Sequence, residues 1–177
     1  MQFGVNNLGH FLLTHLLLPV LANSPKPRII HLSSIGQFPG RIKPQTFRGG
    51  RKLYLPGIPA YAQSKLANVL FSNELAQRLP HNITSNAVHP GFVDSDFFRN
   101  IPSFIYKPMR KLLVSTEQCG RFISDMALSA SWEDRTGEFV SAQGPLPVSP
   151  RTRNAALRHW LYDESCRLVD VTPIAVA

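Results

Sequence analysis

The stretch Arg28-Ile29-Ile30-His31-Leu32-Ser33-Ser34-Ile35-Gly36 decides the fold of this chain. Its apolar run predicts a buried strand, which ends in two hydroxyls and a glycine turn. Apolar strands alternate with helical patterns along the rest of the sequence, so we expect an α/β fold with a parallel sheet of three strands and helices on both faces. We expect strands at 28–32, 83–88 and 137–141, helices at 4–21, 60–78, 116–130 and 152–168, a loop over 36–59 and an irregular segment over 92–109.

Residues that could form a binding site follow two of the predicted strands. Ser34 follows the first strand, and His89-Pro90-Gly91 follows the second. In parallel sheets covered by helices, ligands bind beyond the carboxyl ends of the strands. Both motifs are therefore expected at one edge of the sheet, where a binding site would lie.

The helical pattern after the long loop carries an acid/base pair, in the run Pro59-Ala60-Tyr61-Ala62-Gln63-Ser64-Lys65-Leu66-Ala67-Asn68. A four-residue step places Tyr61 and Lys65 on one helix face. An ammonium beside a phenol favours the phenolate and lowers the phenol pKa from its usual value near ~10. The pair can then serve as a general acid/base for a carbonyl or alcohol. Spacing alone also fits an amphipathic helix with a half-buried Tyr and a solvated Lys.

Four segments in this order resemble the C-terminal two-thirds of the short-chain dehydrogenase/reductase family, over roughly residues 2–170. They are the two runs quoted above, together with Phe3-Gly4-Val5-Asn6-Asn7-Leu8-Gly9-His10-Phe11-Leu12-Leu13-Thr14 and Asn86-Ala87-Val88-His89-Pro90-Gly91-Phe92-Val93-Asp94-Ser95. The first of these two, the long loop before Tyr61 and the late Val148-Ser149-Pro150 tract look most like the retinol-dehydrogenase branch. The resemblance implies the C-terminal part of a Rossmann-like, doubly wound sheet.

The resemblance also implies roles for individual residues. Tyr61 would exchange a proton with the substrate oxygen, Lys65 would lower the Tyr61 pKa and bind the nicotinamide ribose, and Ser34, rather than Ser33, would hydrogen-bond the substrate oxygen. Asn6 would lie in the helix that supports Lys65 through a water. Four further residues would line the nicotinamide, with Ser95 where the family usually has Thr: Pro90, Gly91, Val93 and Ser95. Taken singly, these residues also fit a strand-end Ser turn, a helix N-cap Asn and a Pro-Gly turn.

The sequence contains no glycine-rich turn of the kind that holds a cofactor pyrophosphate at a helix N-terminus. Gly49-Gly50 is a pair in a basic loop with no strand before it. We therefore expect residues 1–177 to form a single, truncated short-chain dehydrogenase-like domain. NADP, or alternatively NAD, is the expected cofactor, and its binding would be impaired in this chain.

Two classes of function stay open. One is an NAD(P)-dependent oxidoreductase that interconverts an alcohol and a carbonyl on an apolar substrate such as a retinoid, a steroid or an aldehyde. The aromatic and aliphatic residues in 97–113 and 36–59 favour such a substrate. The other is an inactive fragment or a non-catalytic interaction protein that retains the second half of the fold.

Composition and charge limit the kinds of partner that the chain is expected to bind. The net charge is +8, and residues 1–73 hold eight Lys or Arg and no acid. This imbalance fits a solvated loop, attraction of a phosphorylated cofactor, or attraction of a polyanion such as anionic lipid. Without a basic motif interleaved with aromatics we expect no nucleic-acid partner. Cys119 and Cys166 have neither disulfide nor zinc-ligand spacing, so no metal site is expected and a reducing compartment is indicated.

The apolar run Phe11–Leu21 is too short to span a bilayer, for which ~20 residues are needed, and is expected to face the core. The resemblance fits a cytoplasmic location or association with the endoplasmic reticulum, and relatives often carry a membrane anchor. With no upstream neighbour, the strand 28–32 would offer an apolar free edge, which predicts aggregation or an edge-paired homodimer.

Overall fold

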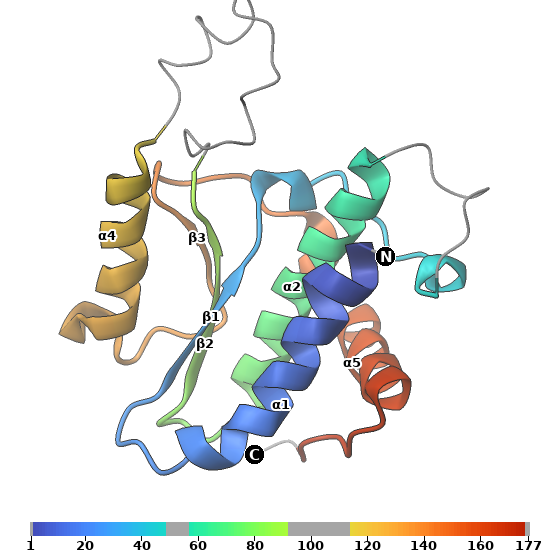
Figure 1. Cartoon of the computed structure of the whole chain (residues 1–177), viewed down its shortest axis with the longest axis horizontal. Coiled ribbons are helices and arrows are strands. Elements are labelled where there is room, and N and C mark those ends of the chain that lie inside the picture. Colours follow the sequence, from blue (N-terminus) through green and yellow to red (C-terminus); the bar gives the residue numbers. More distant parts are fainter. Residues whose placement is uncertain (1, 49–56, 92–113, 176–177) are drawn as a thin grey trace, which may run out of the picture.

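The computed structural model describes residues 2–48, 57–91 and 114–175. Its sheet consists of β1 (Arg28–Leu32), β2 (Thr84–His89) and β3 (Phe139–Ser141), in the order β1-β2-β3 (Figure 1). All neighbours are parallel, with Ile30 opposite Asn86 and Val88 opposite Val140. The predicted three-stranded parallel sheet is confirmed.

Helices cover both faces of this sheet, as the alternation of patterns predicts. The long helix α2 (Ile58–Arg78) connects β1 to β2 and lies beside α1 (Gly9–Leu21) on one face, with α5 (Ala155–Val169) packed outside α2. The helix α4 (Thr116–Leu128) lies on the opposite face (Figure 1). Because all neighbouring strands are parallel, their carboxyl ends lie at the same edge of the sheet.

The core divides along the same two faces. Between the sheet and the α1, α2 and α5 layer, Phe11, Phe71, Leu75 and Tyr162 are buried together. On the other face, Val88 packs with Met126 and Trp132. Both faces of the sheet are therefore covered, as is usual for parallel sheets.

Several element ends differ from the sequence expectation for local reasons. α2 begins at Ile58, because Pro59 suits the first turn of a helix. The last helix begins at Ala155 instead of residue 152, because Asn154 accepts a cap hydrogen bond from the Leu157 amide and a 3-10 turn occupies Pro150–Arg153. The helix expected over 116–130 ends at Leu128, β2 lies one residue later than expected, and β3 begins two residues later.

The start of the chain is helical, but not uniformly α-helical. A π-helical turn spans Gly4–Leu8 and continues directly into α1. Such turns are rare and occur often at functional sites. Within the described ranges, no helix is long and apolar enough to cross a membrane. The irregular segment expected over 92–109 lies outside those ranges, as does 49–56 of the long loop.

Candidate functional site

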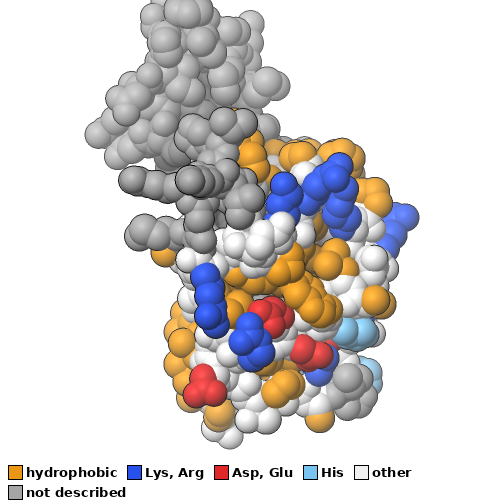
Figure 2. All heavy atoms as spheres, turned by 90° about the vertical axis from the view of Figure 1, so that its right-hand side faces the viewer, with side chains coloured by type: hydrophobic (Ala, Val, Ile, Leu, Met, Phe, Trp, Pro, Cys, Tyr) orange, Lys and Arg blue, Asp and Glu red, His pale blue; other side chains and the backbone are white. Residues whose placement is uncertain are grey.

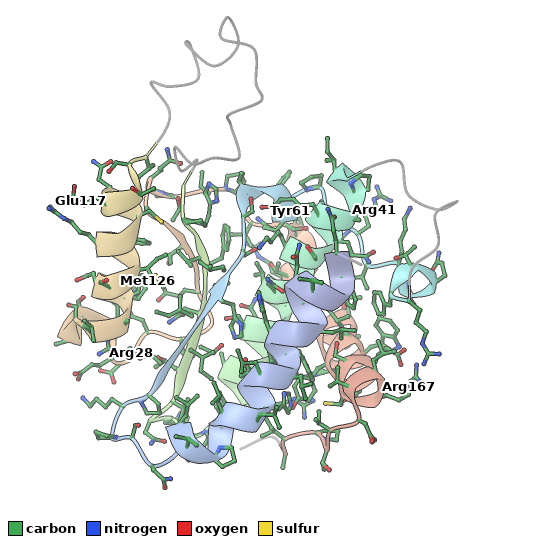
Figure 3. All side chains as sticks on the ribbon, in the orientation of Figure 1. Arg28, Arg41, Tyr61, Glu117, Met126 and Arg167 are labelled. Atoms are coloured by element: carbon green, nitrogen blue, oxygen red, sulfur yellow. The ribbon has the colours of Figure 1, made fainter. Side chains whose placement is uncertain are left out.

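Ser34 and Tyr61 both lie next to Gly36, beyond the carboxyl end of β1 (Figure 3 labels Tyr61). Ser34 follows β1, and Tyr61 lies in the first turn of α2. Gly36 separates them: a Cβ at that position would lie 3.1 Å from Cε1 of Tyr61 and 3.5 Å from Oγ of Ser34. Any larger side chain would enter the space between the phenol ring and the hydroxyl, so the glycine permits their approach.

The two consecutive serines at the end of β1 have different tasks. Ser33 donates its hydroxyl to the backbone oxygen of Lys65 at 2.8 Å, which ties the strand end to α2. The Oγ of Ser34 accepts the Gly36 amide at 3.1 Å. A hydroxyl that accepts one hydrogen bond still has its own proton to donate. Of the two serines, Ser34 is therefore the one able to donate to a ligand oxygen.

Lys65 completes the group beside Tyr61. Its Nζ lies 5.6 Å from the centre of the Tyr61 ring and donates to the backbone oxygen of Leu32 at 3.1 Å. Burial lowers the pKa of Lys65 from its ordinary value. An ammonium has three donors, so two remain for other acceptors after the bond to Leu32. The Tyr61 side chain is 37% exposed, which leaves it accessible from solvent.

Asn6 contacts α2 directly through Ser64. Its Nδ2 donates to Oγ of Ser64 at 3.2 Å, and Ser64 in turn donates to the Tyr61 backbone oxygen at 2.8 Å. The direct side-chain partner of Asn6 is therefore Ser64. Asn6 lies within the π-helical turn, and this contact ties the turn to the Tyr61 end of α2.

The sequence analysis did not single out a pair of buried asparagines that also connects the π-helical turn to α2. Nδ2 of Asn7 donates to Oδ1 of Asn68 at 3.0 Å, and Nδ2 of Asn68 donates to the Leu32 oxygen at 2.9 Å. Both asparagines are 1% exposed. The signal available in the sequence was a polar residue at an apolar position: Asn68 lies three residues after Lys65, inside the apolar pattern of α2.

The candidate residues after β2 are only partly described. Gly91 has a φ of 95°, and a Cβ there would lie 2.7 Å from Cγ2 of Val114. Both features require glycine, because other residues seldom adopt positive φ. Pro90 precedes it at the end of β2. Val93 and Ser95 lie outside the described residues.

A cavity of about 190 Å³ lies beside the first turn of α2. It is lined by Pro39, Arg41, Lys43, Ile58, Pro59 and Ala62. Figure 2 shows Lys and Arg side chains gathered near this end of the molecule, among apolar ones. This is the described part of the basic region expected from the sequence.

Relatives of known name match almost the whole chain. Retinol dehydrogenase 12 of Mus musculus is 39% identical over 173 residues, covering 96% of this chain and 54% of the relative. Retinol dehydrogenase 11 of Homo sapiens is 40% identical over 173 residues, with the same coverage. The polyprenol dehydrogenase of Danio rerio is 36% identical over 180 residues. The chain spans about half the length of the curated relatives it matches. No family model matches it.

Solved structures share the fold. An uncharacterised protein from Mycobacterium paratuberculosis matches with a TM-score of 0.67 and 28% identity, over 96% of this chain and 58% of that one. A short-chain dehydrogenase of Shigella flexneri, solved with NADP, matches with a TM-score of 0.57 and 22% identity over 80% of this chain and 52% of that one. The chain is thus similar in sequence to retinol dehydrogenases and shares its fold with short-chain dehydrogenases. This similarity confirms the branch that the sequence motifs indicated.

Proposed function

We propose that this chain carries the catalytic part of an NAD(P)-dependent oxidoreductase that interconverts an alcohol and a carbonyl on an apolar substrate. The observation that carries the proposal is the convergence of three groups at the carboxyl edge of the sheet. They are the Ser34 hydroxyl, the Tyr61 phenol and the Lys65 ammonium. A hydrogen-bond donor, a proton donor and a cation in one place suit a reaction at a carbonyl oxygen.

The chemistry assigns each group one task. Tyr61 gives its proton to the substrate oxygen in reduction and accepts it in oxidation. The Lys65 ammonium stabilises the phenolate that forms, and Ser34 donates its free proton to the same substrate oxygen. Asn6 holds the first turn of α2 through Ser64, which keeps the phenol in position. Positioning of this kind contributes substantially to enzymatic rates.

The described residues fit the nicotinamide end of a dinucleotide. Lys65 has two ammonium donors available for a ribose, and at Gly91 a side chain would fill the space beside Val114. Pro90 and Gly91 would line the ring, with Val93 and Ser95 as further candidates. The bound cofactor would supply or accept the hydride. NADP is preferred over NAD, since two structural relatives were solved with NADP bound.

The apolar substrate class rests on the relatives. Their names describe dehydrogenases of retinol and polyprenol, which are apolar alcohols. Residues 97–113, which we expect to shape the substrate pocket, lie outside the described residues. A retinoid is therefore the first substrate to test, before steroids and aliphatic aldehydes.

One observation favours a second candidate function. The chain spans 54% of its retinol dehydrogenase relatives, and its sequence has no glycine-rich phosphate turn. Contacts to the remote parts of a cofactor help to position its reacting end. Residues 1–177 taken alone would then act as a non-catalytic unit with weak affinity for NAD(P).

Two measurements separate these candidates. Calorimetry of the 177-residue chain with NADPH should give a dissociation constant well above ~1 μM, the value that corresponds to about −8 kcal/mol. A low-micromolar constant would show that the chain holds the cofactor unaided. Turnover of retinal with NADPH should appear when the chain is joined behind the N-terminal half of a retinol dehydrogenase relative.

In that joined protein, Tyr61→Phe should lower kcat by roughly 10²-fold or more, because general acid catalysis contributes about that much. NADPH affinity should change little. Tyr162→Phe is the control, because Tyr162 lies in the core and bonds His15 and Ile174. Near-normal turnover in Tyr61→Phe would contradict the assigned role.

A further inference from the structure

Lys65 shares its backbone acceptor with a buried asparagine. The Leu32 oxygen accepts from Nζ of Lys65 at 3.1 Å and from Nδ2 of Asn68 at 2.9 Å. A carbonyl oxygen has two lone pairs, so these two donors use both. Asn68 therefore constrains the direction from which the ammonium can approach that oxygen.

Asn68 is itself fixed in one orientation. Its Oδ1 accepts from Nδ2 of Asn7 at 3.0 Å, so the amide oxygen faces the π-helical turn and the amide nitrogen faces Leu32. This orientation leaves the amide nitrogen as the only Asn68 group that can reach the carbonyl. The chain of bonds runs from the π-helical turn, through α2, to the end of β1.

The π-helical turn explains how two consecutive residues reach the same helix. Asn6 bonds Ser64 and Asn7 bonds Asn68, four residues apart on one face of α2. Successive side chains of an α-helix diverge by about 100°. The wider π turn lets neighbouring side chains face one partner more nearly together. The turn thus ties α2 at both the Tyr61 and the Lys65 levels.

We propose that Asn68, oriented by Asn7, is a positioning residue that fixes the Leu32 carbonyl as the anchor of the Lys65 ammonium. The anchor holds one of the three ammonium protons and aims the other two away from the strand end. A Lys side chain has large rotamer freedom, and a fixed acceptor removes much of it before a ligand arrives. This inference rests on the proposed role of Lys65.

The test measures the pKa of the Lys65 ammonium directly. Lysine labelled with ¹³C at Cε is incorporated into the 177-residue chain, and the Lys65 signal is assigned with Lys65→Met. Its pKa is then measured by titration in the wild type and in Asn68→Leu. The variant replaces a polar amide beside the ammonium by an apolar group of similar size, and this loss of a polar neighbour disfavours the charged form.

The Lys65 pKa should fall by about 0.5 pH unit or more in Asn68→Leu. Asn7→Ala should shift it in the same direction by less, and it carries the test if Asn68→Leu does not fold. Ser72→Ala is the matched control. Ser72 lies one turn further along α2, is fully buried, and loses a 3.1 Å bond to Ser85 that does not touch Leu32.

An unchanged Lys65 pKa in the folded asparagine variants would overturn the proposal, as would an equal shift in Ser72→Ala. Turnover plays no part in this measurement. A failure of the proposed oxidoreductase activity would appear in the retinal assay of the joined protein and leave the titration unaffected, so the two failures are distinguishable.

Discussion

Two neighbouring serines that follow the carboxyl end of β1 have different roles. Ser33 and Ser34 are chemically identical, yet only one of them is used to attach the strand to α2. Ser33 donates its proton to the Lys65 backbone oxygen, whereas Ser34 keeps its proton for a ligand.

His31 is a second residue whose surroundings determine its role, because burial determines its protonation. It is 5% exposed in β1, and its ring meets Phe71 edge-on with the ring centres 5.0 Å apart. Burial, with a smaller effect of His10, lowers the pKa of His31 to about 4. The folded chain therefore holds this histidine neutral over a range of pH in which the unfolded chain would bind a proton.

This difference predicts an acid-sensitive fold. Between pH 6.5 and about 4, the unfolded state binds one more proton at residue 31 than the folded state. The unfolding free energy should therefore fall as the pH falls through this window, by at most about 3 kcal/mol from this group. Urea unfolding at a series of pH values measures it.

The control for this pH dependence is His31→Gln, which removes this titrating group and should reduce the slope in that window; burial also lowers the pKa of His15 and of His89, which keep part of it. His81→Gln, at an exposed position, should leave the slope as it is. An identical slope in His31→Gln and the wild type would contradict the assignment.

At the scale of elements, α2 is the central support of the site and α5 holds it from outside. Glu74 of α2 is fully buried and accepts hydrogen bonds from Arg78 at 2.6 Å and from Arg158 of α5 at 2.8 Å. Its Oε1 also lies 2.7 Å from Nδ1 of His159. Burial raises the pKa of Glu74, but bonds from His159, Arg158 and Arg78 outweigh it, and the net pKa is below its usual value.

We expect Glu74→Gln to lower the unfolding free energy by about 3–5 kcal/mol, because it leaves two largely buried arginines without a carboxylate. A depressed carboxyl pKa contributes stability above pH ~4.5, and this is lost as the pH falls through the folded-state value. The difference between wild type and variant should accordingly shrink in acid. Denaturant unfolding at pH 7 and pH 4 tests both statements.

Glu117→Gln is the control for this buried cluster. Glu117 also pairs with an arginine four residues along its helix, but both side chains are more than 70% exposed. Exposed pairs of this kind contribute roughly 0.2–1 kcal/mol. Equal losses in the two variants would show that the α2–α5 contact does not depend on the buried carboxylate.

At the scale of the whole molecule, one side of the sheet combines a free strand edge with an apolar helix. Among the described strands, β1 pairs on one side only. Its Leu32 is 44% exposed, and α1 exposes an apolar row made up of Leu13, Leu16, Leu17 and Val20. Residues 1–25 contain no Lys, Arg, Asp or Glu. Unpaired edges and uncharged apolar faces favour association.

We therefore expect the 177-residue chain to form an edge-paired dimer or larger aggregates, and to become monodisperse when the N-terminal half of a relative precedes it. Light scattering measures this directly. The double variant Leu16→Lys, Val20→Lys should reduce association by placing charge on the apolar row. Leu128→Lys is the control, because Leu128 is 82% exposed on α4, across the sheet. A stable monomer with a cooperative melt would contradict the prediction.

Sequence reasoning alone was enough to predict the α/β class, the three strands, the retinol-dehydrogenase branch and the residues at the sheet edge. Strands and helices have local periods of two and 3.6 residues, and the motifs stand at fixed places relative to them. A reader of the sequence can therefore place Ser34, Tyr61 and Lys65 near one another without coordinates. Element ends were less accurate, because caps such as Asn154 and 3-10 turns set them.

The contacts that hold those residues in place come from tertiary packing and could not be predicted. Asn7 and Asn68 are 61 positions apart, and Glu74 and Arg158 are 84 apart, so no local period connects either pair. Polar groups can be buried inside an apolar pattern only when a distant partner completes their hydrogen bonds. That partner becomes known when the helices pack, which is why the supports of Lys65 and of α2 had no signal in the sequence beyond a polar residue in an apolar place.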